Sequence, residues 1–435
     1  MTGRSYLRKD LGFFALTVVV TLAGAAGRVD AQDFDPTSPV QPAVRFGPLA
    51  LAPIFRLTEF GYDSNVYNRA EDNNPAGDFS SRLTPSVDAS LRSAHVRIRG
   101  RSLVDVYYFK ALSDLNSVDS DNVGQVDLAM NRVGLFVNGR RLTTRHRRTL
   151  EIDAIARRRN SDLSVGGSVR LTGKTSLEMF VTRARLDYAA DSLFLDTNLA
   201  QQLNHTAWTQ GFALGYAATS LTRFSVEASR TRARFDAEAD RDSGEWRVTP
   251  TVTFSPLALV TGRASIGYYR RTFSALAPAA SSAGGVPSSA APANLTSAAQ
   301  TGTSALINLT YTLLGRTRLN IDATRRLEYS YLAVVNDYLQ TSITGSVTQR
   351  LGESWDVVGR FGRSRLSYQQ SDEPNQAALQ IPAETVYTSG ADLGYNIRHT
   401  RLGLYVSQDR RTAAAAALTR GYRRVRIGAS ATYVF

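Results

Sequence analysis

Residues that could carry out chemistry are few in this chain and lie far apart. None of the 435 residues is cysteine and four are histidine. This excludes disulfide scaffolds, thiol catalysis and cysteine-ligated metals, and it leaves no histidine cluster for a metal. The grouping that most resembles a hydrolase is His205 with Asp187, Asp191 and Ser192 nearby in a polar segment. Polar segments bring such residues together by chance, so we expect neither an enzyme nor a cofactor.

Arginine is the other chemically prominent residue type. The chain has 51 lysines and arginines against 38 acidic residues, for a net charge of +13, and only Lys9, Lys110 and Lys174 are lysine. Such an excess suits nucleic-acid binding, but the cations are spread evenly and an export signal is expected. We therefore expect no nucleic-acid partner. The planar guanidinium also pairs well with phosphate and carboxylate groups.

The amino-terminal residues are typical of a secretory signal. Basic residues precede an apolar run over 11–26 that is too short to span a bilayer comfortably as a helix, and small residues come just before Gln32. We expect a cleaved signal peptide over 1–31, with an uncleaved anchor as the alternative. A short periplasmic segment over 32–43 and one domain over 44–435 then follow.

From Val44 onward apolar and polar residues alternate with a period of two, as Trp246, Val248 and Val252 do with arginine and threonine. Most alternating segments run for about 10–14 residues, and tight turns alternate with long polar connections. This pattern predicts an all-β fold, namely a transmembrane antiparallel outer-membrane β-barrel. We expect 18 strands, with 16 as the alternative, and a water-filled lumen. The fourth and fifth strands are expected at 122–137 and 142–156, and no connection is an obvious constriction loop.

Strict alternation assigns one face of the expected strands to the lumen. This face carries both signs of charge, and its cations outnumber its anions, which predicts a weak preference for anionic solutes. The lumen-lining candidates are Arg82, Asp88, Arg92, Arg97, Arg99, Arg101, Asp105, Arg170, Glu178, Glu227, Arg247, Arg263, Asp322, Arg360, Asp392, Asp409, Arg424 and Arg426.

A second set of arginines continues the lipid-facing phase of the strands, about seven to nine residues beyond the tight turns, where an apolar band should end. We expect an external belt that binds lipopolysaccharide phosphates. The alternative is a bulge in each strand that turns these side chains into the lumen. The belt candidates are Arg183, Arg185, Arg230, Arg232, Arg234, Arg270, Arg325, Arg363 and Arg365.

The last strand ends in aromatic residues that alternate along one face. Tyr433 and Phe435 resemble the C-terminal signal read by the outer-membrane assembly machinery, although Ser430 stands where glycine is usual. We therefore expect that machinery, together with outer-membrane lipid and lipopolysaccharide, to be partners of the chain.

The stretch GYDSNVY, which includes Gly61, Tyr62, Asp63 and Asn65, follows the first strand. With the repeated strand pattern and the aromatic end, it resembles the beta-barrel porin type 2 family over roughly 44–435. That resemblance implies a porin-like barrel associated with exopolysaccharide export, with periplasmic export components as further expected partners. Asp63 and Asn65 are candidates for binding a cation or sugar, and the alternative is an Asx-rich turn.

These observations favour a passive channel for hydrophilic solutes or an exported polysaccharide. Only about twelve residues, 32–43, are expected between the signal peptide and the first strand, so we expect neither the plug of a TonB-dependent transporter nor a passenger domain. The alternatives are a surface-exposed structural or adhesive barrel with a plugged lumen and, less favoured, a membrane-embedded barrel hydrolase.

Overall fold

The computed structural model describes residues 44–147, 149–153, 155–273, 299–332, 335–369, 381–412 and 420–435. The expected signal peptide and the segment over 32–43 lie outside these residues, as does most of the connection over 274–303.

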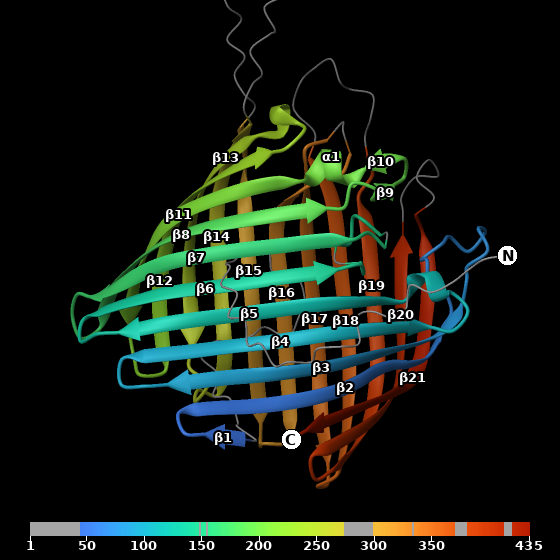
Figure 1. Ribbon diagram of the computed structural model, residues 1–435, viewed down its shortest axis with the longest axis horizontal. Helices are drawn as coiled ribbons and strands as arrows, with labels where there is room; N and C mark the ends of the chain where they lie inside the picture. Colours follow the sequence, from blue (N-terminus) through green and yellow to red (C-terminus); the bar gives the residue numbers. More distant parts are fainter. Residues whose placement is uncertain are drawn as a thin grey trace, which may run out of the picture.

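The chain forms a single closed barrel of 18 antiparallel strands (Figure 1). Each strand pairs with the next along the chain, and β21 pairs with β2 to close the ring. Closure satisfies the backbone hydrogen bonds that a sheet edge would leave open. The strands are β2 (Leu49–Asp63), β3 (Asp78–Arg92), β4 (Val96–Phe109), β5 (Ser117–Ala129), β6 (Val133–Thr144), β7 (Arg158–Arg170), β8 (Thr175–Tyr188), β11 (His205–Ala217), β12 (Thr222–Phe235), β13 (Ser243–Phe254), β14 (Val260–Phe273), β15 (Ala299–Leu313), β16 (Thr317–Tyr329), β17 (Asp337–Leu351), β18 (Trp355–Gln369), β19 (Glu384–Ile397), β20 (Thr400–Thr412) and β21 (Tyr422–Val434).

The remaining elements are short and lie outside the ring. They are β1 (Val44–Phe46), which pairs with β2, the β9–β10 pair (Leu193–Phe194 and Thr197–Asn198), α1 (Leu199–Leu203) and two 3₁₀ turns, η1 (Ser113–Leu115) and η2 (Ala239–Arg241). Within the described ranges, no helix is long and apolar enough to cross a membrane.

The two ends of the barrel differ in the length of their connections, as the sequence predicted. One end has tight turns, such as 93–95, 130–132 and 218–221, and the other has the longer loops, such as 64–77, 145–157 and 189–204. In outer-membrane barrels the turns face the periplasm and the loops face outside. The loop end is therefore the extracellular end.

The predicted fourth and fifth strands were wrong in position, although the total of 18 strands is confirmed. The fourth strand, β5, starts at Ser117 and ends at Ala129, and β6 follows after the tight turn over 130–132. This turn contains neither glycine nor proline, so the period-two pattern runs through it without a break. The predicted strand over 142–156 is mostly a loop, over 145–157.

The outer surface of the barrel is apolar across the middle of its strands. Large exposed side chains such as Phe212, Val226 and Ile266 alternate with inward-facing polar residues. Since successive side chains of a strand point to opposite faces, this alternation separates an apolar exterior from a polar interior.

Candidate functional site: the lumen and the loops at its mouth

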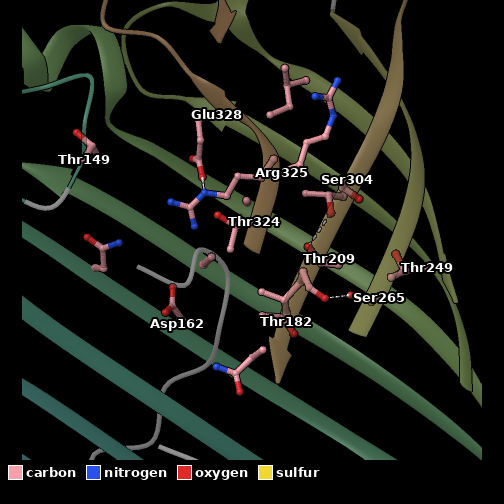
Figure 2. Close-up of a pocket in the computed structure, with 18 of the residues that line it drawn as sticks. Thr149, Asp162, Thr182, Thr209, Thr249, Ser265, Ser304, Thr324, Arg325 and Glu328 are labelled. Atoms are coloured by element: carbon pink, nitrogen blue, oxygen red, sulfur yellow. Dashed lines mark hydrogen bonds and ion pairs between the residues drawn. The ribbon is translucent and has the colours of Figure 1, made fainter. Parts of the chain in front are cut away.

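The interior holds a cavity of about 1500 Å³ lined largely by hydroxyl, amide and charged side chains. Figure 2 shows Thr182, Thr209 and Thr249 among the side chains that line it. Each comes from a different strand, at a position whose sequence neighbours face outward. An interior of this size and polarity suits water and hydrophilic solutes.

Ion pairs between neighbouring strands organise the charges on the inner wall. Arg101 donates from Nη2 to Asp88 Oδ2 at 2.7 Å, Arg140 donates from Nε to Asp121 Oδ1 at 2.9 Å, and Arg426 lies 3.0 Å from Asp409. Arg401 bridges Asp356 and Asp392. Because neighbouring carboxylates offset these cations, the wall presents patches of both signs rather than one positive surface.

The structure locates every lumen candidate on the inward-facing phase of its strand. Glu227, Arg247, Arg263 and Asp322 line the cavity directly. The lumen-lining residues predicted from the sequence did not include every carboxylate on the inner wall. It lacked Asp119, Asp121, Glu245 and Asp356, which are all buried on the inner wall. The first two were missed because the expected strand began at 122, whereas Asp356 could have been found from its alternation with Arg360.

The described residues of the loop over 145–157 fold into the mouth of the barrel. Ser330 Oγ donates to Glu151 Oε1 at 2.6 Å, and the Tyr331 backbone N–H donates to Oε2 at 3.3 Å. These partners lie on the β16–β17 loop, and β8 and β11–β15 separate β7 from β16 along the wall. No connection stood out in the sequence as a constriction loop, but the structure brings this segment into the mouth, and we call it the constriction loop.

Two arginines from the final hairpin hold the backbone of the constriction loop. Arg411 Nη1 donates to the Leu150 carbonyl at 2.8 Å, and Arg420 donates to the Glu151 carbonyl. Within the loop, Arg147 Nε lies 2.7 Å from Asp153 Oδ1, which also accepts a bond from Asn68. The loop is thus anchored by three separate parts of the wall and mouth.

An apolar core forms where the extracellular loops meet. Ile152 and Ala156 of the constriction loop pack with Leu199 and Leu203 of α1 and with Tyr331 of the β16–β17 loop. All five are less than a tenth exposed. Burying this surface stabilises the docked loop over part of the lumen opening.

Burial perturbs two titratable groups of the constriction loop. Loss of solvation raises the pKa of Glu151 to about 8, so its carboxyl is largely protonated at neutral pH. Loss of solvation also lowers the pKa of His146 to about 4, and its ring lies against Tyr107 with 3.5 Å between ring centroids. The side chains of Glu151 and His146 are therefore both uncharged at neutral pH while the loop is docked.

The residues weighed for a hydrolase have other roles in the structure. His205 Nδ1 lies 2.7 Å from the Leu203 carbonyl, and its ring packs against Phe235 and Tyr329. Asp187 pairs with Arg185. No hydrogen bond joins His205 to an acid or a serine among the described residues.

The GYDSNVY stretch lies at the seam where β2 meets β21. Arg424 Nε donates to both oxygens of Asp63, and the Ser64 and Val425 backbone N–H groups donate across the seam. Asn65 is 1% exposed and bonds the Arg69 and Arg423 carbonyls. Since partners from the protein occupy both Asp63 and Asn65, the structure favours the Asx-rich turn over a cation or sugar site.

By strand register, the arginines expected to form an external belt lie on the outward phase of their strands, although Arg185 and Arg325 also border the cavity. Register is continuous between β8, β11 and β12, so no bulge turns Arg183 or Arg230 inward. The guanidinium of Arg183 lies 5.8 Å from the Trp208 ring centroid, and that of Arg230 lies 5.1 Å from Trp246. Tyr433 and Phe435 also face outward, with their ring centroids 4.7 Å apart.

A closed 18-strand barrel with an apolar exterior and a charged interior defines the class of protein: an outer-membrane β-barrel of a Gram-negative-type bacterium. No family model and no curated protein matches the chain.

Several solved structures share its general architecture. The chain resembles a BenF-like porin from Pseudomonas fluorescens Pf-5 over 89% of this chain and 98% of that one, with 11% identity and a TM-score of 0.47. It resembles outer membrane protein OpdK from Pseudomonas aeruginosa over 88% and 98%, with 8% identity and a TM-score of 0.42. A bacterial polysaccharide outer membrane secretin matches over 88% and 98%, with 9% identity and a TM-score of 0.33.

Proposed function

We propose that the protein is a passive outer-membrane channel for small hydrophilic solutes, narrowed at its extracellular end by the constriction loop. The observation that carries this proposal is the polar cavity of about 1500 Å³ below a loop whose tip reaches across to the β16–β17 loop. A wide polar lumen passes water and ions, whereas a docked loop excludes large solutes.

Selectivity for anions is a second part of the proposal, and it rests on the excess of arginine in the lumen. The carboxylates that pair with Arg101, Arg140 and Arg401 reduce this excess. The preference should therefore be weak. A reversal potential measured under a salt gradient tests it, and a clear preference for cations would contradict it.

The same channel could also serve for passage of an exported polysaccharide, which is the broader form of the proposed function. It is supported by the resemblance of the GYDSNVY stretch and the strand pattern to the beta-barrel porin type 2 family. A hydrated polymer needs a wider opening than the docked loop leaves. Glycan export would therefore require the constriction loop to leave its position. Polymer flux that rises when the loop is released would support this wider function.

A surface-exposed structural barrel is the second candidate function. The apolar core formed by Ile152, Leu199 and Tyr331 favours it, because such a core resembles the packing of a permanent plug. The two functions predict different electrical behaviour, since a plugged barrel passes little current.

Conductance of the purified, folded protein in a planar bilayer tests these proposals. The variant Glu151→Ala removes the acceptor for Ser330 and Tyr331 and should raise the unit conductance. The matched control is Glu178→Ala, which also removes one inner-wall carboxylate but from β8, where it makes none of these loop contacts. If the folded wild type and both variants all pass no current, the channel function is contradicted and the structural role is favoured.

A further inference from the structure

The outer face of the barrel carries arginines that the lumen does not use. We define the outer arginine belt as exposed or half-exposed arginines on the outward phase of the loop-side part of the strands. Besides the predicted residues other than Arg185, which forms ion pairs within the protein, and Arg325, which borders the cavity, it includes four exposed outward arginines that sequence reasoning missed. The belt consists of Arg141, Arg159, Arg183, Arg230, Arg232, Arg234, Arg270, Arg363, Arg365, Arg410 and Arg423.

Aromatic rings separate arginines in two neighbouring rows of the belt. Trp208 on β11 is paired with Arg183 on one side and with Arg232 on the other. Trp246 on β13 is likewise paired with Arg230 and Arg270. The two tryptophans are 52% and 57% exposed, so their faces and the flanking guanidinium groups are open to the surroundings.

These arginines lie where the apolar exterior ends, and their charge needs a counterpart there. A guanidinium beside hydrocarbon is costly unless it reaches water or an anion. Arg183, Arg230 and Arg232 have no ion-pair partner among the described residues. A neighbouring ring stabilises such a cation but does not neutralise it.

Arg185 shows the contrasting arrangement at the same end of the barrel. It was predicted as part of the belt, but it forms ion pairs with both Asp187 and Asp236. These carboxylates satisfy its charge within the protein, and we therefore leave Arg185 out of the binding surface. Arg230 and Arg232 lie on β12, which β11 separates from β8, and they have no ion-pair partner among the described residues.

We propose that the outer arginine belt binds the phosphate groups of lipopolysaccharide in the outer leaflet. The rows around Trp208 and Trp246 form its strongest subsite. The acyl chains of the lipid would lie along the apolar exterior below, where side chains such as Phe212 and Val226 are exposed. Guanidinium groups bind phosphate through paired charge-assisted hydrogen bonds, which suits these arginines better than lysine would. Lipid binding at this outer surface does not depend on whether the lumen conducts.

Lipopolysaccharide retained by the protein provides the test. A triple variant carries Arg230→Gln, Arg232→Gln and Arg234→Gln. This variant and the wild type would be extracted from the outer membrane of the same host, and the lipid bound per barrel would be measured. Each lost charge-assisted contact should weaken binding by roughly tenfold. We expect clearly less lipid on the variant, and titration of lipid-free protein with purified lipopolysaccharide should give a higher Kd.

The matched control carries the same change of charge at the opposite end of the barrel. Arg132, Arg316 and Arg398 are exposed in the tight turns, and their replacement by Gln should leave lipid retention unchanged. Folding of each variant is checked by the heat-dependent shift in gel mobility. Equal lipid content in the belt variant and the wild type would overturn the proposal, as would equal affinity for lipopolysaccharide with and without its phosphates.

Discussion

Asp63 and Arg424 form an ion pair that joins the first and last strands of the barrel. The Arg424 guanidinium donates to both carboxylate oxygens of Asp63, at 3.0 and 2.9 Å from Nε. The two side chains are 3% and 16% exposed. The pair therefore lies at the one seam that hairpin formation between successive strands cannot close.

Breaking this pair should destabilise the barrel. Asp63→Asn leaves Arg424 without its charged partner, and losing one member of a largely buried ion pair costs about 3 kcal/mol. In detergent, the folded barrel migrates differently on a gel from the unfolded chain. We expect the Asp63→Asn variant to unfold, and so to change its gel mobility, at a lower temperature than the wild type. The control Asp409→Asn breaks the more exposed pair with Arg426 and should cost less. Equal shifts for the two variants would contradict a special role for the seam.

Gly61 should be needed for closure of the same seam. A Cβ placed on Gly61 would lie 2.1 Å from the Ile427 carbonyl oxygen and 2.4 Å from the Gly428 Cα, so β2 or β21 would have to move. We expect Gly61→Ala to lower the yield of folded barrel. The control is Gly345→Ala, because a Cβ there meets nothing within 4 Å. A normal yield of folded Gly61→Ala protein would show that the seam tolerates the shift.

Docking of the constriction loop should weaken as the pH rises from about 6.5 to 8. Burial raises the pKa of Glu151 to about 8, above its usual 4.5, so the docked state binds a proton that the released loop gives up. Docking is therefore strongest below pH 4.5, the usual pKa of a glutamate carboxyl. It weakens as the pH rises toward about 8, the pKa of Glu151 in the docked loop. His146 acts in the opposite direction, but only below its usual pKa of 6.5.

Conductance measured over this pH window checks that expectation. Opening should become more frequent by at most about tenfold per pH unit. Glu151→Gln keeps a neutral side chain of the same shape at every pH, so its conductance should not change over the window. An equal pH dependence in this variant would mean that another group titrates.

Covalent attachment of the constriction loop should hold the channel in its narrow state. The chain has no cysteine. A double variant with Glu151→Cys and Ser330→Cys therefore has only two thiols, at positions whose side chains are hydrogen-bonded in the native structure. A short cleavable thiol crosslinker should lower the conductance of this variant, and cleavage should restore it. Glu151→Cys alone, treated in the same way, is the control. An unchanged conductance after verified crosslinking would show that the loop does not limit flow.

The sequence by itself determined the barrel, its strand number and its two unlike ends. These features are local: alternation is read over neighbouring residues, and each hairpin pairs strands that are adjacent along the chain. Inward and outward positions such as Arg247 and Trp246 followed from the same alternation. The exception was the turn over 130–132, where the alternation continued through a change of direction and displaced two strands.

Only the tertiary structure decided how the ring closes and what fills its mouth. Asp63 and Arg424 are 361 residues apart, Arg420 and Glu151 are 269 apart, and Ser330 and Glu151 are 179 apart. No local pattern pairs residues over such separations. Burial of Glu151 and docking of the constriction loop arise because barrel closure brings loops from distant hairpins to one small opening, where they can pack together.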